Sequence, residues 1–270
     1  MPTTLRDLHA VASRLWPLAG AEDWDVVGLA VGDPEDRVTR VLLAVDPVLE
    51  TVEEAVSGGF DVLLTHHPLL LRGVTSLAAD HIKGALVTRL IRGGCALYSA
   101  HTNADAVDDG TSGVLAAALG VRNARPFDGE PGSGIGRVGD LEAPTTLGVL
   151  ARRLAALLPS TAGGVLGSGD FDRPVTRVAI CGGAGDAFLA HPAVTGADVY
   201  ITADLRHHPA QDARQQAVLA GGPALLGVSH WASEWLWLDT AAAGLRTALP
   251  AVEFEVSELR TDPWDFAVMQ

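Results

Sequence analysis

Basic residues are scarce in this chain of 270 residues, which has 19 Lys and Arg against 33 Asp and Glu and a formal net charge of −14 at pH 7. Proteins that bind nucleic acids normally carry a basic surface that neutralises phosphates. The sequence contains no comparable cluster of Lys and Arg, so we expect neither a DNA nor an RNA partner. Bound divalent cations would reverse the charge locally, which keeps a small anionic ligand compatible with the acidic total.

Long apolar runs and cysteines are also lacking. No uninterrupted apolar stretch reaches the ~20 residues that a membrane-spanning helix needs, and the segment from Met1 to Asp7 lacks the basic and apolar regions of a signal peptide. Two cysteines, Cys95 and Cys181, are too few for a disulfide framework and are expected to be buried thiols in a reducing compartment. We therefore predict a cytoplasmic protein that has no membrane partner.

The chain does contain an alternation of strand-like and helix-like segments. Short runs of β-branched and aliphatic residues predict strands at residues 38–45, 61–65, 95–99, 175–181, 199–202 and 224–229. Helices are expected at residues 5–18, 47–56, 80–92, 110–119, 147–158 and 210–220, and a further helix is expected to start at 186–191. This alternation predicts an α/β fold with mixed, mostly parallel sheets flanked by helices.

Several landmarks of the first half recur in the same order in the second half. The segment Gly59 to Thr65 (GFDVLLT) is similar to Gly196 to Thr202 (GADVYIT), and RVLL at 40–43 is similar to RVAI at 177–180. We therefore predict two related α/β domains, residues 1–125 and 126–270, joined near a stretch rich in Gly and Pro at 125–139. A chance likeness between ordinary βα units is the alternative.

Six of the nine histidines lie in four short segments, each just after an apolar run. The segments are His66-His67-Pro68, His101 to Asp105, Asp204 to Pro209, and His230 to Glu234. Open α/β sheets bind their ligands beyond the carboxyl ends of the strands, so coordinating side chains in these places would meet at one edge. The two segments His-x3-Asp and His-x3-Glu also have a spacing that aligns two side chains on one face of a helix.

These residues predict a dinuclear metal centre between the two halves. The expected ligands are three imidazoles and two carboxylates, with residues 1–125 contributing His66, His67 and Asp105 and residues 126–270 contributing His230 and Glu234. Such a set suits two divalent ions of zinc, iron, manganese or cobalt, with Glu234 as the expected bridge. Two ions about 3.5–4 Å apart can activate water and stabilise an oxyanion.

The roles of other polar segments stay open at this point. His101 could be an outer partner of a ligand or a proton carrier, and His207-His208 could line the pocket, cap the following helix or contact a phosphate. The glycine loop from Cys181 to Asp186 could hold an anion with its amides or form a tight turn. Three nearby tryptophans are expected mainly to pack the wall of the site, with purine stacking as the alternative: Trp231, Trp235 and Trp237.

The segment Trp24 to Gly32 (WDVVGLAVG) resembles the amino-terminal signature of the NGG-interacting-factor-three-like family, whose members are commonly named GTP cyclohydrolase 1 type 2 homologues or dinuclear metal-centre hexameric proteins. The resemblance continues in order over nearly the whole chain. Val26 stands where the family usually has Asn, and Ala203 where a Thr-Gly-Asp motif has Gly. We expect the first change to alter a loop hydrogen bond and the second to tighten the turn before His207. The chain is also too short for the domain that longer members insert between their halves.

This resemblance implies a homohexamer of chains, each with two α/β domains facing a dinuclear centre, and the five predicted ligands match the family's metal positions. It further implies a hydrolase that acts on a nucleotide or similar small molecule, such as GTP, through a metal-activated water. The alternative is a non-catalytic metal-binding scaffold or metal chaperone with a protein partner. A mononuclear metalloprotease is disfavoured because the sequence has no His-Glu-x-x-His motif.

Overall fold

The structure, a computed structural model, describes residues 2–128 and 134–269, which form two compact units. Unit 1 comprises residues up to Ala104 together with Leu238–Thr261, and unit 2 comprises Asp105–Trp237 and the residues from Asp262 onward. Each unit contains a mixed sheet flanked by helices, which confirms the predicted fold class. The sequence division at 125/126 depends on repeated landmarks and stays a prediction, and part of the stretch 125–139 lies outside the described residues.

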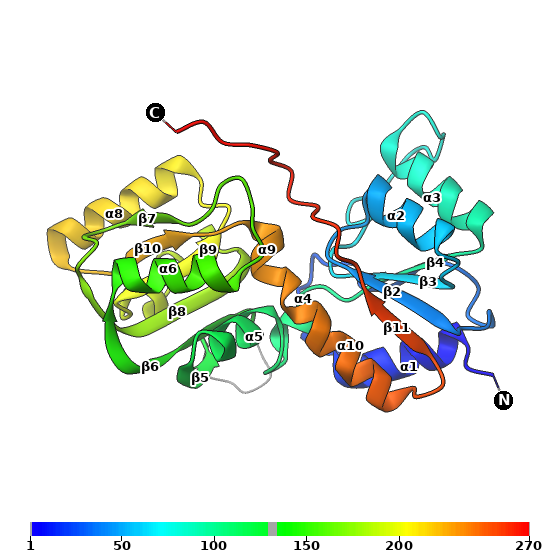
Figure 1. Ribbon diagram of the computed structural model, residues 1–270, viewed down its shortest axis with the longest axis horizontal. Coiled ribbons are helices and arrows are strands. Elements are labelled where there is room, and N and C mark those ends of the chain that lie inside the picture. Colours follow the sequence, from blue (N-terminus) through cyan, green and yellow to red (C-terminus); the bar gives the residue numbers. More distant parts are fainter. Residues whose placement is uncertain (1, 129–133, 270) are drawn as a thin grey trace. The chain divides into compact units, whose positions relative to one another are not determined.

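Unit 1 is built on a five-stranded sheet in the order β1-β4-β3-β2-β11 (Figure 1). Four neighbouring strands are parallel, and β1 pairs antiparallel with β4 at one edge. In Figure 1, α2 and α3 cover one face of this sheet, while α1 and α10 lie on the other. The strands are β1 (Gly28–Val31), β2 (Arg40–Ala44), β3 (Val62–Thr65), β4 (Ala96–Ser99) and β11 (Glu253–Val256). The helices are α1 (Leu5–Leu15), the 3₁₀ helix η1 (Leu18–Gly20), α2 (Leu49–Ser57), α3 (Ile82–Gly93) and α10 (Trp237–Ala248).

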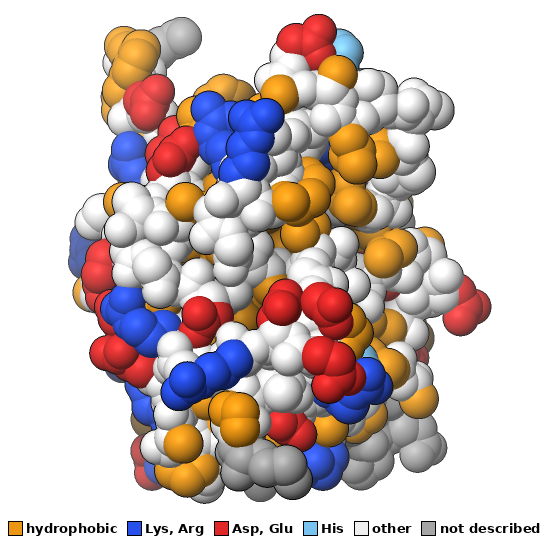
Figure 2. Space-filling view, turned by 90° about the vertical axis from the view of Figure 1, so that its right-hand side faces the viewer, with side chains coloured by type: hydrophobic (Ala, Val, Ile, Leu, Met, Phe, Trp, Pro, Cys, Tyr) orange, Lys and Arg blue, Asp and Glu red, His pale blue; other side chains and the backbone are white. Residues whose placement is uncertain are grey.

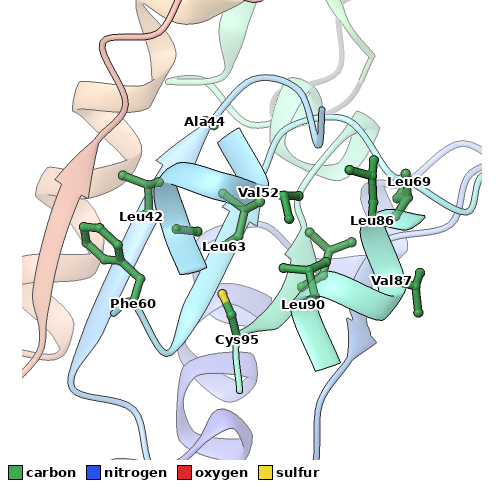
Figure 3. Close-up of a cluster of buried hydrophobic side chains, with 12 residues drawn as sticks. Leu42, Ala44, Val52, Phe60, Leu63, Leu69, Leu86, Val87, Leu90 and Cys95 are labelled. Carbon is green, nitrogen blue, oxygen red and sulfur yellow. The ribbon is translucent and has the colours of Figure 1, made fainter. Parts of the chain in front are cut away.

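The core of unit 1 explains why its central strands are apolar throughout. Leu42, Leu63 and Leu97 are paired across three strands and belong to one buried cluster. Val52 of α2 and Leu90 of α3 pack in the same cluster, as Figure 3 shows beside Leu42 and Leu63. The intervening strand residues are buried as well, because helices cover the opposite face. Strands that are buried on both faces read as continuous apolar runs rather than as alternating ones.

Unit 2 contains a six-stranded sheet in the order β5-β6-β8-β9-β10-β7. Strands β8, β9 and β10 are parallel, whereas β5, β6 and β7 pair antiparallel with their neighbours. The strands are β5 (Val121–Pro126), β6 (Gly136–Thr146), β7 (Leu166–Ser168), β8 (Pro174–Ala184), β9 (Val199–Ala203) and β10 (Ala224–Gly227). The helices are α5 (Thr111–Ala118), α6 (Leu147–Leu157), the 3₁₀ helix η2 (Asp186–Phe188), α7 (Pro192–Thr195), α8 (His207–Ala220) and α9 (His230–Trp235). The short helix α4 (Thr102–Ala106) contains the boundary between the units.

The repeated landmarks have the same structural role in both units. In unit 1, the Asp61 carboxylate accepts hydrogen bonds from the amides of Thr39 and Arg40, at 2.6 and 2.9 Å. In unit 2, Asp198 accepts from the amides of residues 176 and 177, both at 2.8 Å. Each aspartate thus lies just before one parallel strand and anchors the strand beside it, next to the first residues that the two strands pair.

Three predicted helices differ from the observed ones for local reasons. The helix expected at 5–18 ends at Leu15, because Pro17 disfavours helical geometry at the residue before it. α8 begins three residues before the predicted position 210, since Pro209 lies in its first turn, where proline is tolerated. The segment expected to start a helix at 186 forms η2, and α7 begins only at Pro192.

The described residues contain no helix that is long and apolar enough to cross a membrane. Cys95 and Cys181 are buried free thiols, as expected. Burial raises the pKa of each to about 12, so both stay protonated at neutral pH. On the face shown in Figure 2, Lys and Arg side chains are interspersed with Asp and Glu, with hydrophobic side chains exposed between them.

Candidate metal centre

Three histidines of unit 1 gather beyond the carboxyl ends of two neighbouring parallel strands. His66 and His67 follow β3, and His101 follows β4. Each offers one nitrogen, and the three nitrogens lie within 4.8 Å of one another. The adjacent pair can converge because β3 has already ended at Thr65, whose hydroxyl donates to the carbonyl of His67 at 2.7 Å. The structure therefore places His101 in one group with two predicted ligands.

Hydrogen bonds fix the tautomer of all three imidazoles. Nδ1 lies 2.9 Å from the Ala100 carbonyl in His66, 2.7 Å from Asp46 Oδ1 in His67 and 2.9 Å from Asp25 Oδ1 in His101. A carbonyl or an ionised carboxylate can only accept, so each Nδ1 carries the proton. Each Nε2 then keeps its lone pair, which is the arrangement of histidines that bind metals through Nε2.

Asp25 is a functional residue that the sequence analysis did not single out. Its side chain is fully buried and accepts hydrogen bonds from His101 and from both the amide and the hydroxyl of Thr102. Burial alone would raise the pKa of Asp25, but these hydrogen bonds outweigh it and hold the pKa well below its usual range. The carboxylate therefore stays ionised and orients the imidazole.

Unit 2 holds a second pair of candidate ligands on α9. Two residues separate the end of β10 from His230, which begins this helix, and Glu234 follows one turn later, with His230 Nε2 at 3.0 Å from Glu234 Oε1. His230 Nδ1 lies 2.7 Å from Asp204 Oδ2, so this histidine too has a carboxylate behind it. Burial lowers the pKa of His230, but the charges and hydrogen bonds of Glu234 and Asp204 outweigh it and raise the pKa to about 11.

Asp105, the fifth predicted ligand, is buried in unit 2. Its carboxylate accepts a hydrogen bond from the Thr111 hydroxyl. The segment that carries it is held by the buried guanidinium of Arg137, which donates to five backbone carbonyls, those of Asp105, Ala106, Val107, Gly134 and Gly136. These bonds satisfy the carbonyls at the end of α4, which no helix continues.

The glycine segment 182–185, which includes the last residues of β8, uses its amides inside unit 2. Gly182 and Gly183 donate to the hydroxyls of Ser112 and Ser233, both at 2.9 Å. Gly183 has φ +69, and a Cβ built on it would lie 2.3 Å from Glu234 Oε1. Neither expected role is observed, because both amides are occupied inside the unit and the segment continues β8 as far as Ala184, with a register irregularity between Ile180 and Ala184 in its pairing with β9. The missing side chain of Gly183 lets this end of the strand approach a candidate ligand.

The remaining predicted positions have simpler roles. His207 and His208 are exposed on the first turn of α8, and the cap of that helix is Arg206. Ala203 is buried in β9, and the positive φ of +53 falls on Asp204 after it. The three tryptophans near the end of β10 pack into the interior, with Trp231 and Trp237 buried and Trp235 half-buried.

The structure thus gathers His66, His67 and His101 in unit 1 and His230 with Glu234 in unit 2. That all five predicted ligands close on one dinuclear centre stays a prediction. The signal for the outer carboxylates was present in part, because Asp46 comes directly after a predicted strand and Asp204 comes two residues after another.

Comparisons with known proteins agree with these features. The Duf34/NIF3 (NGG1p interacting factor 3) family matches residues 3–263. A GTP cyclohydrolase 1 type 2 homolog of Streptomyces coelicolor is 45% identical, with 96% of this chain and 93% of the relative covered. A homolog of the same name from Mycobacterium tuberculosis is 34% identical over 376 aligned positions, covering 98% of this chain and 97% of the relative. It therefore carries about 100 positions that this shorter chain lacks.

Solved structures show the same fold. The crystal structure of a Staphylococcus aureus hypothetical protein has a TM-score of 0.89 and 27% identity, with 99% of this chain and 100% of that chain covered. A Bacillus cereus protein described as related to NIF3 has a TM-score of 0.86, with the same coverage, and its 22% identity supports likeness of fold alone. From the match of residues 3–263 and the 45% identity to a curated relative, we conclude that this chain belongs to the Duf34/NIF3 family.

Proposed function

We propose that this protein is a metal-dependent hydrolase that acts on a nucleotide or similar small molecule. In this proposal two divalent ions are held by five side chains, those of His66, His67, Asp105, His230 and Glu234. The observation that carries it is the hydrogen bond on Nδ1 of each of the three ligand histidines, to a carbonyl or carboxylate at 2.7–2.9 Å. Such bonds prepare Nε2 to bind a metal.

The donor set fits first-row divalent ions. Imidazole nitrogens together with carboxylate oxygens suit zinc, iron, manganese and cobalt, whereas magnesium and calcium prefer oxygen alone. The proposal requires the histidines of unit 1 and the His230–Glu234 pair of unit 2 to bind the same pair of ions. Bound ions would supply an activated water and a positive charge that stabilises an oxyanion.

The protein's own residues then orient the ligands and move protons. Asp25, Asp46 and Asp204 hold imidazoles in one tautomer, which keeps the ligand nitrogens in place. His101 has its Nδ1–H on a buried, ionised carboxylate, so its Nε2 can take up a proton and release it to a leaving group. This pairing gives His101 the role of proton carrier.

The names of the relatives suggest a guanine nucleotide as the first substrate to test. In the corresponding reaction water adds to C8 of guanine, the imidazole ring opens, and formate is released after a further hydrolysis. The homohexamer implied by the family resemblance and the cytoplasmic location belong to the same proposal. Light scattering from the purified protein would measure the size of the assembly.

The test is formate release from GTP by metal-loaded protein, beside the variant Glu234→Ala. We expect formate from the wild type and none from the variant. Glu142→Ala is the matched control, because Glu142 forms an exposed ion pair with Arg122 and should leave the rate unchanged. Activity that survives Glu234→Ala would contradict the proposal. Failure to hydrolyse any nucleotide, together with ready exchange of bound metal, would favour the metal scaffold or chaperone instead.

A further inference from the structure

Trp24 is a large aromatic side chain that unit 1 leaves open to solvent beside its histidines. It is 57% exposed, and its ring centroid lies 5.8 Å from that of His101 with an interplanar angle of 75°. Among the described tryptophans, the only other one exposed to this degree is Trp264, near the carboxyl end of the chain. Exposure of a tryptophan loses the free energy that its burial would provide, so the position of Trp24 calls for an explanation.

The turn that carries Trp24 is firmly attached to the candidate site. The amide of Asp25 donates to the carbonyl of Glu22 at 2.9 Å, which closes a turn with Trp24 inside it. The amide of Glu22 donates to the Thr102 hydroxyl at 2.9 Å, and the Asp25 carboxylate accepts from His101 and Thr102. The hydrogen bonds that orient His101 therefore also fix the backbone on both sides of the indole.

We infer that Trp24 is the platform on which a planar heterocycle of the substrate, a purine base, stacks next to the histidine group. This inference rests on the proposed function and adds the part of the substrate that unit 1 recognises. A ring held on a fixed turn binds at a low entropic cost, because little of its freedom is left to lose. Stacking on an indole needs only a flat aromatic face, which every nucleobase provides.

The charges around Trp24 favour the base over the phosphates as its partner. The two residues before it, Glu22 and Asp23, are exposed carboxylates. They would repel a triphosphate, whereas they can accept hydrogen bonds from the amino and imino groups of guanine. We therefore expect a nucleotide to place its base at Trp24 and to direct its phosphates away from this turn.

The experiment is calorimetric titration of the metal-loaded full chain with guanosine, GTP and inorganic tripolyphosphate. Trp24→Ala should weaken binding of guanosine and GTP about 10-fold, leave tripolyphosphate binding unchanged and retain the full metal content. Trp24→Phe should recover most of the lost affinity, since phenylalanine keeps a face for stacking. Trp264→Ala, which removes the other exposed tryptophan, should bind all three probes like the wild type.

Two outcomes would overturn the inference. One is a wild type that does not bind guanosine, and the other is Trp24→Ala that binds guanosine as tightly as the wild type. If Trp24→Ala binds guanosine like the wild type but changes its assembly size on light scattering, the inference is also overturned, and Trp24 is a contact between protein chains. Failure of the proposed function would look different, because Trp24-dependent guanosine binding would then persist without formate release.

Discussion

Replacing Gly183 by alanine tests whether the glycine loop exists to admit a carboxylate ligand. The new Cβ would lie 2.3 Å from Glu234 Oε1 and 3.1 Å from His230 Nε2, at a backbone φ of +69. Two costs follow. The left-handed conformation is unfavourable for alanine by about 1–2 kcal/mol, and the carboxylate must withdraw by roughly 1 Å to reach an ordinary contact, at a further cost of about 1–3 kcal/mol in a packed interior.

We therefore expect Gly183→Ala to lower the free energy of unfolding by about 3 kcal/mol and the affinity for zinc by about 10- to 100-fold. Urea denaturation of chelated protein and calorimetric zinc titration would measure these two effects. Gly120→Ala is the matched control in the same unit, since Gly120 has φ +76 and its Cβ would meet nothing within 4 Å. In the control, the free energy of unfolding should fall only by the cost of the left-handed backbone, and the zinc affinity should stay unchanged. Equal losses in the two variants, or unchanged zinc affinity in Gly183→Ala, would refute the reasoning.

Three further changes test the surroundings of the candidate ligands. Burial lowers the pKa of His230, but neighbouring carboxylates outweigh it and raise the pKa to about 11. In chelated protein the protonated imidazole therefore stabilises the fold fully below its unfolded pKa of ~6.5, and this stabilisation is lost as pH rises towards 11. Urea midpoints should accordingly fall over this range in the wild type and fall less in Asp204→Asn, and parallel curves would contradict this. Arg137→Met should lower the free energy of unfolding by about 3 kcal/mol because buried carbonyls lose their donor, whereas the exposed Arg122→Met should change it by less than about 0.5 kcal/mol. Asp25→Asn should weaken zinc binding about 10- to 100-fold in calorimetry, and an unchanged affinity would show that its hydrogen bonds do not orient a ligand.

The central parallel strands could be predicted from the sequence because burial on both faces makes them apolar throughout. β3 and β9 are examples, with every residue buried. The strands at or near the sheet edges could not be predicted in this way. β5 reads Val-Arg-Asn-Ala-Arg-Pro with only its end residues buried, and β11 alternates Glu-Phe-Glu-Val. Their pairing depends on partners that a local window does not contain.

The candidate site was predictable to the extent that its chemistry lies in rare residues at strand ends. Histidine pairs are uncommon, so His66-His67 stood out, whereas Asp25 is one of many aspartates and reveals its role only through its contact with His101. The close approach of Gly183 to Glu234 was equally hidden, because glycine-rich turns serve many purposes. Side-chain type therefore indicated the candidate ligands, and tertiary contacts were needed to find what orients them.

The aspartates that precede β3 and β9 have an effect at the opposite end of their strands. Asp61 and Asp198 each bind two consecutive amides of a neighbouring strand. Slippage of that strand by one residue would turn every side chain to the other face of the sheet. Asp61 lies five residues before His66, and Asp198 lies six residues before Asp204, the carboxylate behind His230. Each anchor therefore helps to set which way a candidate ligand or its carboxylate partner points. Weakening either anchor should impair metal retention in a protein whose ligands are all intact.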